Sequence, residues 1–466
     1  MSTQSLQKSS RSYKYLIGGV VALLLFIVSL LVSAYIYSAW LLNPVSSAQA
    51  SNALERFDGS YLLTISDADM VGTAYADDVL MQIPNDRDTL TIFDLPLDDS
   101  SPVGQEELFV SNSVTSWPQV MAISPEGARA YIVETASEIA DDVDVYPNLQ
   151  ANPPTGRSLT VVDLEANTTQ VYDVMDNPLH IGLHPQERFV AIGGTQANAQ
   201  LALLPIDTLA DASTYQFFSI ENRHGEPARE VTSVSWHPSG DYLAIGVDRS
   251  ELLFYSITYT ETNIISLQPF GERLQLGNTI SYGEFTADGE YYLTTEINWG
   301  AVPGALGYAF NPRGEMIAIR FDDSELANHE IASRVEVGQS PEGFAISPDN
   351  QLIVTVDMRR TYLPDALSFI PGTNLNSLSL LTFDTESGQL SLVDQYGFEG
   401  VLPEHATFDA DGDALAVVIY NEREMPMNPG YIEFWHVLVD EDTPSLERTT
   451  TTIPVTRGAH SIIAIP

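Results

Sequence analysis

The chain of 466 residues contains no cysteine and has very little positive charge. Without cysteine, the sequence excludes disulfide frameworks, thiolate nucleophiles and cysteine-ligated metal sites. It carries 63 Asp and Glu against 20 Lys and Arg, for a formal net charge of −43. Neutralisation of phosphates by Lys and Arg supplies much of the affinity for nucleic acids, so nucleic acid is excluded as a partner.

The few basic residues are unevenly placed along the chain. Lys8 and Lys14, the two lysines, lie in the first fourteen residues together with Arg11, and the first acidic residue is Glu55. The remaining 17 basic residues are all arginines and share the rest of the chain with every acidic residue. With 44% hydrophobic and 18% charged residues, this acidic part still has a folding composition.

An uncharged apolar stretch occupies residues 15–42. It exceeds the roughly 20 residues that a helix needs to cross a bilayer. Because basic residues precede it and none follows closely, we expect residues 1–14 to be a cytoplasmic tail and residues 15–42 a transmembrane helix. Residues 43–55 would then be a linker, and the rest of the chain would lie outside the cytoplasm. The sequence thus predicts a single-pass protein of the cell membrane.

A long, cleaved signal peptide is the alternative for this segment. Ala48-Gln49-Ala50 has the small-x-small form of a cleavage site, and cleavage after Ala50 would give a secreted protein. The apolar core is longer than the 7–15 residues typical of signal peptides, which favours a signal anchor. Either outcome exports the large domain.

Beyond residue 55, short apolar runs rich in Val, Ile, Tyr and Phe alternate with turn residues, which indicates an all-β fold. A strand-turn-strand motif recurs every 49 to 62 residues. Its six copies are Val120–Val133, His180–Gly193, Ser233–Gly246, Tyr282–Thr295, Gly343–Val356 and His405–Val418. Each period is long enough for four antiparallel strands, the unit of a β-propeller blade.

The two ends of the chain complete the repeat. Gly458–Pro466 resembles only the first strand of the motif, while Ser60–Ser66, Thr89–Leu95 and Glu107–Ser113 supply three further strands. Joining them closes the ring and removes open sheet edges. We therefore predict a seven-bladed β-propeller over residues 56–466, with the last blade built from both ends. In the fourth repeat, Gly307–Asn311 is the expected third strand, and Phe310–Ile319 is interpreted as the hairpin of the third and fourth strands.

The repeats resemble those of the YVTN-type and lactonase-like seven-bladed β-propellers, whose blades carry a similar SPDG turn followed by an apolar strand. Lactonase-like propellers have a Pro-Arg-His segment and a strand that ends in Asn-Glu. Asn177–His180 and Arg457–His460 are similar to the first, although Leu179 stands where the arginine would be, and Tyr131–Thr135 is similar to the second. The resemblance implies a hydrolase that uses His180, His405 or His460 together with Glu134.

Histidines occupy one position of the motif in three of the seven blades, at His180, His405 and His460. This position lies near the mouth of the central channel, where propellers commonly bind ligands. Converging imidazoles could bind a transition metal or act as a general base. The alternative is that they bond the backbone of the neighbouring blade or channel waters.

Long loops between the second and third strands lie on the same face. Arg359, Arg360 and Arg423 lie on two of these loops, and Glu296 begins another. Loops of this length usually have a function, and the arginines could bind an anionic ligand over the channel. Alternatively, they are isolated counter-charges of an acidic surface.

Two acidic segments raise the question of calcium. Asp409–Asp413 alternates carboxylates around a glycine, but its alignment with the other repeats makes it a turn between two strands. Asp141, Asp142 and Asp144 lie on the first long loop and have no such structural explanation, so they are the candidate calcium ligands. No other cofactor is predicted.

The sequence contains no complete catalytic set, so a binding module is the leading hypothesis. It predicts a membrane-anchored propeller that binds a protein or envelope polymer through its loop-rich face. A lactonase-like hydrolase and a metal-dependent enzyme, each with its site at the channel mouth, are the alternatives.

Overall fold

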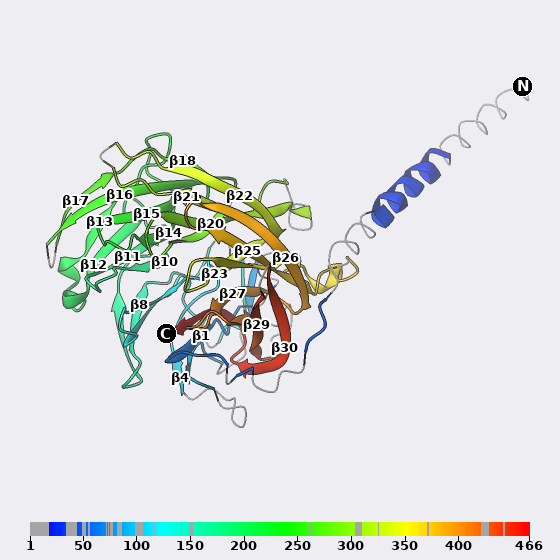
Figure 1. Ribbon diagram of the computed structural model, residues 1–466, viewed down its shortest axis with the longest axis horizontal. Coiled ribbons are helices and arrows are strands. Elements are labelled where there is room, and N and C mark those ends of the chain that lie inside the picture. Colours follow the sequence, from blue (N-terminus) through cyan, green and yellow to red (C-terminus); the bar gives the residue numbers. More distant parts are fainter. Residues whose placement is uncertain are drawn as a thin grey trace, which may run out of the picture.

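The structure is a computed structural model. It describes residues 18–33, 44–48, 53–54, 56–70, 72, 74, 78–81, 86–97, 106–115, 117–140, 142–149, 152–260, 263–302, 310–324, 326–370, 372–420, 428–440 and 443–466. These residues form seven antiparallel sheets of the blade type, arranged in a ring (Figure 1). The predicted seven-bladed β-propeller is therefore confirmed. Its blades are numbered here in the order of the sequence repeats.

Within each blade, four strands follow one another from the inside of the ring outwards. Blades one to three contain β5 (Met121–Ile123), β6 (Arg129–Val133), β8 (Ser158–Asp163) and β9 (Thr168–Asp173); β10 (Pro178–Leu183), β11 (Phe189–Gly194), β12 (Leu201–Pro205) and β13 (Gln216–Phe218); and β14 (Val231–Trp236), β15 (Tyr242–Val247), β16 (Glu251–Tyr259) and β17 (Ile264–Pro269), with β18 (Leu274–Gln275) added beside β16. Blades four to six contain β19 (Ile280–Phe285), β20 (Tyr291–Glu296), β21 (Arg313–Arg320) and β22 (Glu330–Gln339); β23 (Pro341–Ile346), β24 (Leu352–Asp357), β25 (Leu375–Asp384) and β26 (Gln389–Glu399); and β27 (Pro403–Phe408), β28 (Ala414–Ile419), β29 (Gly430–Asp440) and β30 (Thr443–Val455).

The seventh blade joins the two ends of the chain, as the sequence predicts. Its strands are β31 (Ala459–Ile465), β1 (Tyr61–Ser66), β3 (Thr89–Asp94) and β4 (Glu106–Phe109). Tyr61 pairs with Ile465 across the junction, and the C-terminus lies beside β1 in Figure 1. The closure buries Ile462 and leaves neither end of the ring with an open inner strand.

In blades five and six, a side chain at the anchor position of the motif closes the turn between the first two strands. Ser347 Oγ accepts a hydrogen bond from the Leu352 N–H at 2.9 Å. Asp409 Oδ1 accepts one from the Ala414 N–H at 3.0 Å in blade six. The segment 409–413 thus connects β27 to β28, which confirms that it is the turn between the first two strands of its blade.

Blade four differs from the sequence prediction. Its third strand is β21, which begins at Arg313, and residues 303–309 lie outside the described residues. Phe310–Ile319 is therefore not a hairpin, since its last seven residues belong to the single strand β21. The turn-like Asn311-Pro312-Arg313-Gly314 sequence imitated the repeat motif, whereas the pairing of Tyr291 with Arg320 shows where the strand lies.

The long loops of one face form a hydrophobic layer of their own. Buried apolar side chains from the loops of blades five, six and seven and of blade one pack together in it: Met70, Ala74, Leu80, Val114, Ile139, Leu149, Met358, Tyr362, Leu363, Leu402 and Tyr420. Strands β2 (Val79–Met81) and β7 (Val145–Pro147) pair within this layer. We refer to it as the loop layer. It covers part of the channel end and shapes the cavity described below.

The amino-terminal segment is described in two parts. Residues 18–33 form an exposed apolar helix that projects away from the ring (Figure 1). Residues 15–17 and 34–42 of the predicted transmembrane helix lie outside the described residues. Among the residues that are described, no helix meets both the length and the apolarity needed to span a membrane. Residues 44–48 lie against blades five and six, where Val45 N–H donates to Gly397 O and Ala48 N–H to Arg448 O.

Candidate functional site

A cavity of about 390 Å³ lies at the channel mouth, on the face that carries the long loops. Loops and strand ends of six blades line it, and in chain order they contribute Met70, Ala74, Thr115, Trp117, Thr135, Leu149, Pro153, Asn177, Leu179, Thr195, Glu230, Thr232, Arg249, Trp299 and Glu342. Apolar side chains with a few charged and polar groups are typical of small-ligand sites. This is the face on which the sequence places a ligand site.

Arg249 is held over the cavity by the tight turn between β15 and β16. Asp248 and Arg249 both have positive φ angles, of 48° and 62°. The Asp248 carboxylate fixes this turn by accepting hydrogen bonds from the N–H groups of Arg229 and Glu230, at 2.8 and 3.3 Å. Left-handed backbone is unfavourable for a side chain such as arginine, so the surrounding bonds must hold it there.

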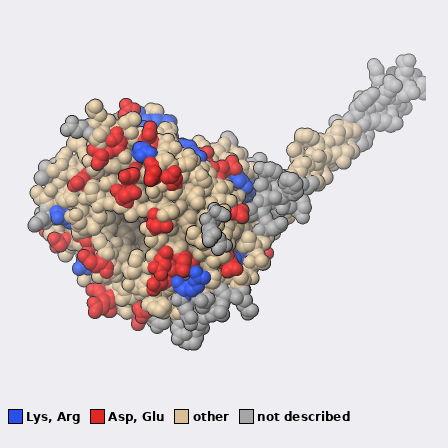
Figure 2. Space-filling model, viewed as in Figure 1, with Lys and Arg blue, Asp and Glu red and all other residues tan. Residues whose placement is uncertain are grey.

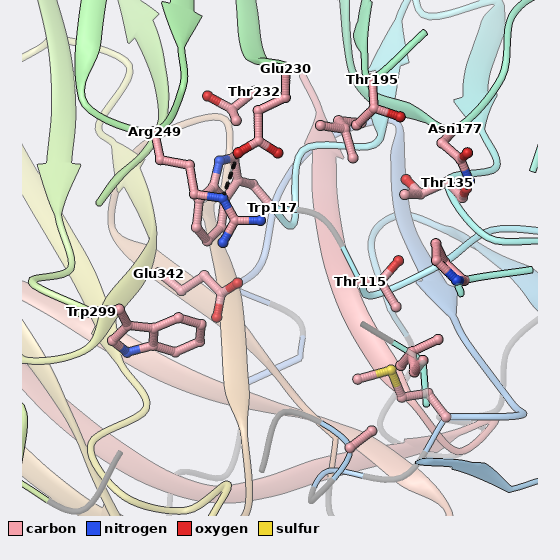
Figure 3. Close-up of a pocket in the computed structure, with 15 residues that line it drawn as sticks. Thr115, Trp117, Thr135, Asn177, Thr195, Glu230, Thr232, Arg249, Trp299 and Glu342 are labelled. Carbon is pink, nitrogen blue, oxygen red and sulfur yellow. Dashed lines mark hydrogen bonds and ion pairs between the residues drawn. The ribbon is translucent and has the colours of Figure 1, made fainter. Parts of the chain in front are cut away.

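The Arg249 guanidinium has one direct carboxylate partner in the cavity wall. Its Nε donates to Glu230 Oε1 at 2.9 Å, the contact dashed in Figure 3. It also lies over the Trp117 ring, 5.7 Å from the ring centroid. Glu230 neutralises Arg249, and Trp117 supports its planar face by a cation–π contact.

Glu342 faces the same region from β23 of blade five and points towards Arg249 in Figure 3. Its side chain is fully buried, and neither carboxylate oxygen has a hydrogen-bond partner among the described residues. Burial raises the pKa of Glu342 to about 8, although the positive charge of Arg249 acts to lower it. At neutral pH this side chain is therefore largely a neutral acid.

The opposite wall of the cavity is uncharged. Thr115, Thr135, Asn177 and Thr195 lie across from Arg249 and Glu342 in Figure 3. Trp299 stands beside Glu342 and donates its indole N–H to Ser340 Oγ at 3.0 Å. The cavity therefore has a charged wall, where an ion-binding group fits, and a polar and apolar wall for the rest of a ligand.

The three candidate histidines do not line this cavity. All three are buried, and burial lowers the pKa of His180 to about 3, of His405 to about 4 and of His460 to about 3. His180 Nδ1 accepts a hydrogen bond from the Val234 N–H of the next blade at 3.1 Å. His405 Nδ1 does the same with the Ile462 N–H of the closing strand at 3.2 Å. Burial thus disfavours the charged form of all three imidazoles, and His180 and His405 bond the backbone of the neighbouring blade.

Inside the channel, the structure does bring some of these rings together. The Tyr282 ring lies between His180 and His405, with centroid distances of 6.1 and 5.9 Å. His460 Nε2 is 2.7 Å from Asn112 Oδ1. Rings from three separate blades thus lie near one another where the inner strands meet.

The hydrogen bonds of Glu134 go to residues other than the histidines it was predicted to assist. Its carboxylate accepts hydrogen bonds from Ser111 Oγ at 2.6 Å, from the Arg157 N–H at 3.0 Å and from both the N–H and Oγ of Ser158. These contacts join the start of β8 to the segment after β4. In this arrangement Glu134 stabilises the first blade by linking it to the segment that precedes it.

Glu296 has a similar bracing position in blade four. It is buried and accepts hydrogen bonds from the N–H groups of Asn278, Thr279 and Asn298, at 2.8, 3.0 and 2.8 Å. Burial raises the pKa of Glu296, and these bonds act to lower it. The carboxylate oxygens of Glu296 thus fix the backbone of the loops before β19 and after β20.

The predicted arginine cluster is only partly described. Arg423 lies outside the described residues, and Arg360 is half-buried. Arg359 is buried, and burial, followed by the charge of Arg360, lowers the pKa of Arg359 to about 10. Neither Arg359 nor Arg360 lines the cavity, where Arg249 stands instead.

The predicted calcium ligands and the acidic cluster of the structure are different residues. Asp141 lies outside the described residues, and Asp142 and Asp144 are exposed. Among the described residues, one group of carboxylates could hold a cation. Its oxygens lie within 4.8 Å of one another in the long loop of the seventh blade, and they belong to Asp67, Asp69 and Asp88.

The oxygens of this acidic cluster already bind the loop layer's backbone. The N–H groups that donate to them belong to Ala68, Met70, Asn112, Val114 and Ile139. Burial raises the pKa of all three carboxyls, to about 8 for Asp69, and neighbouring carboxylates raise it further for Asp69 and Asp88.

Sequence reasoning did not identify Arg249, Glu230 and Glu342. A signal for Glu342 was present, because it directly follows the proline that leads into the first strand, as Leu179 follows Pro178. Both of these residues line the cavity. Arg249 gave no comparable signal, since its turn is short and only the ring geometry brings it opposite Glu342.

Comparison with known proteins identifies the architecture alone. No protein-family model matches the chain, and no curated protein matches it by sequence. Among solved structures, a putative 6-phosphogluconolactonase from Bacteroides uniformis has a TM-score of 0.55 at 14% identity, covering 87% of this chain and 99% of that one. The periplasmic gluconolactonase of Pseudomonas aeruginosa has a TM-score of 0.53 at 15% identity, covering 87% and 100%. A Lactobacillus plantarum protein reaches 0.52 at 11% identity, covering 87% and 99%.

The chain therefore has the fold of lactonase-like seven-bladed β-propellers. At such low identity this likeness concerns the fold and leaves the activity to be argued from the site.

Proposed function

We propose that the protein is a membrane-tethered, extracytoplasmic binding module that takes a small ligand, or one group of a protein or envelope polymer, into the channel-mouth cavity. The cavity's composition is the observation that carries this proposal. Two tryptophans, one ion pair and one unpaired carboxyl converge there from separate blades. A rigid scaffold that positions loop residues around a pocket is a common basis of recognition.

A cavity-blocking variant tests this proposal. Thr195 lies in the cavity wall and is exposed, so Thr195→Trp fills the space without disturbing the buried core. We expect ligands found in a screen of envelope extracts against the full chain in detergent to bind the wild type and to lose at least about tenfold in affinity with Thr195→Trp. Thr168→Trp, on an exposed strand of the same propeller, is the control. Ligands that bind both variants equally would place recognition elsewhere.

Membrane tethering rests on the uncharged stretch of residues 15–42 and the basic residues that precede it. The full chain is expected to stay with membranes in alkaline carbonate, whereas the double variant Leu24→Arg, Ile27→Arg is released, since each central arginine costs about 2.5–3.5 kcal/mol on insertion. Release of the wild type by carbonate would contradict the tether.

The cysteine-free sequence allows a direct test of orientation. A membrane-impermeant maleimide applied to intact cells should label Thr168→Cys, on the propeller, and leave Ser10→Cys, in the tail, unlabelled. The reverse pattern would place the propeller in the cytoplasm.

Lactone hydrolysis is a second candidate, favoured by the fold likeness and by the charged wall of the cavity. Arg249 could stabilise a developing oxyanion, and Glu342 could exchange a proton with water or the leaving oxygen. Turnover of a δ-lactone that falls at least about a hundredfold in Arg249→Met would support it. Turnover equal to that of buffer, or unaffected by this substitution, would exclude it.

A further inference from the structure

Glu342 poses a specific physical problem. Its side chain is fully buried, both oxygens lack a hydrogen-bond partner among the described residues, and they face a cavity large enough for a ligand. A buried carboxylate without partners is unfavourable by several kcal/mol if it is charged, and a buried acid that makes no hydrogen bond is also unfavourable. The site would be stabilised by a group that brings hydrogen-bond donors to these oxygens.

The charges of the cavity wall indicate what that group is. The charged side chains that line it are Glu230, Arg249 and Glu342. Arg249 pairs with Glu230 through a 2.9 Å contact, and no ion pair at salt-bridge distance links it to Glu342 among the described residues. The Glu230 and Arg249 charges compensate each other, so the negative charge of Glu342, when this side chain ionises, has no direct ion-pair partner among the described residues.

The surroundings favour a cation at this place. An ammonium group brings three donors and a positive charge that stabilises the ionised form of Glu342, whereas a hydroxyl brings a donor without the charge. Thr232 Oγ1 is buried in the same wall without a partner among the described residues and offers a further acceptor. The Trp299 ring beside Glu342 adds a surface that favours cations, and the acidic surface seen in Figure 2 attracts them.

We propose that the channel-mouth cavity recognises its ligand through a primary ammonium group that binds the Glu342 carboxylate. This inference rests on the proposed function and deepens it, because it names the chemical class of the ligand. Arg249, held by Glu230, keeps its terminal N–H groups for a hydroxyl or carbonyl oxygen elsewhere on the ligand. An amino sugar or a lysine-like side chain has this combination of groups.

The proposal makes binding and proton release inseparable. The titratable groups that interact with Glu342 are Arg249, whose positive charge favours the ionised form of Glu342, and the buried phenol of Tyr282, whose pKa burial raises. Without ligand, burial raises the pKa of this carboxyl to about 8, which favours the protonated form at pH 7, whereas an ammonium favours the carboxylate. Binding of an amine at pH 7 therefore releases up to about one proton, while binding of a neutral analogue releases none.

Calorimetry on the full chain in detergent separates these cases. D-glucosamine and D-glucose are titrated at pH 7 in two buffers of different ionisation enthalpy, whose heats report the protons released. We expect glucosamine to bind about tenfold tighter than glucose, as charge-assisted hydrogen bonds predict, and to release protons. Glu342→Gln should remove both the preference and the release. Glu404→Gln, at the equivalent position of blade six and outside the cavity wall, should keep both.

The other outcomes overturn the proposal. Glucosamine that binds no tighter than glucose, or a preference that survives in Glu342→Gln, contradicts the role of Glu342. If neither glucosamine nor methylamine binds at millimolar concentration, the proposal is also contradicted, because a cavity that recognises an ammonium group through Glu342 must bind methylamine. In each case the Thr195→Trp experiment decides separately whether the cavity binds ligands at all.

Discussion

His405 and Ile462 join blade six to the closing blade, since Nδ1 of the imidazole accepts a 3.2 Å hydrogen bond from the Ile462 N–H. The same bond links His180 to Val234 between blades two and three. At two of the three blades that carry a histidine at this position of the repeat, the ring thus connects neighbouring inner strands.

His405→Ala should therefore destabilise the protein. The substitution leaves the buried Ile462 N–H without its acceptor, and we expect the free energy of unfolding to fall by about 1–3 kcal/mol. Urea denaturation followed by tryptophan fluorescence measures this change. His224→Ala, which removes an exposed histidine, is the control and should have no effect. A His405→Ala protein as stable as the wild type would disprove the connecting role.

Acid should weaken the fold through the buried histidines. Because burial lowers the pKa of His180 and His460 to about 3 and of His405 to about 4, the unfolded chain binds more protons than the folded one between pH 4 and 6.5. Stability due to these groups is complete above about pH 6.5 and is lost as the pH falls towards 4. Denaturant midpoints measured from pH 7 to pH 4 should fall less steeply in a His180→Gln variant.

Alkali should act through the acidic cluster. Burial and the charge of Asp67 raise the pKa of Asp69 to about 8, so the folded state holds a proton that the unfolded state has lost. Arg457 acts against this shift, and Arg87 and Glu138 lie nearby. The stability contributed by this protonated carboxyl falls as the pH rises from about 4 to 8, by at most about 1.4 kcal/mol per pH unit for one proton.

Asp69→Asn removes this titration and keeps an oxygen for the Ile139 N–H. We expect its melting temperature to decline less between pH 6 and pH 9 than that of the wild type. Asp142→Asn, at an exposed carboxylate, should follow the wild type. Parallel curves for Asp69→Asn and the wild type would show that Asp69 does not carry the titration.

Closure of the ring by its last strand should show in the energetics. Ile462 is fully buried in the core shared by β31 and blade six, so Ile462→Ala should lower the free energy of unfolding by about 2–4 kcal/mol. Ile463→Ala, on the next and half-buried position, should lower it much less. Chemical denaturation of both variants measures the difference. Equal effects would contradict the alternation that the strand pairing imposes.

Salt should stabilise the propeller. At a net charge of −43, repulsion among acidic side chains opposes the compact state, and salt screens it. The melting temperature at pH 7 should rise between 10 mM and 500 mM NaCl, and rise less at pH 4, where carboxyls are partly protonated. A melting temperature independent of salt would show that the acidic groups are too dispersed to matter.

The ring, its blade number and its closure followed from the sequence because each rests on local patterns. The strand-turn-strand motif repeats with a turn-closing residue at one fixed position, such as Ser347 and Asp409. The C-terminal segment matches only the first strand of the motif, so it needs the N-terminal strands to complete a blade. The error at Gly307–Asn311 arose where a turn-like sequence imitated the motif and pairing between strands decided the boundary.

The sequence by itself determined the architecture, the charge of the chain and the face on which a site would lie. The tertiary structure decided which residues form it: it placed the histidines inside the channel and assembled Arg249, Glu230 and Glu342 from blades three and five. The physical reason is that hydrophobic and turn patterns are local and readable along the chain. The partners of a charged side chain depend on closure of the ring. Closure brings loops that are distant in sequence together and excludes water from some of their charged side chains.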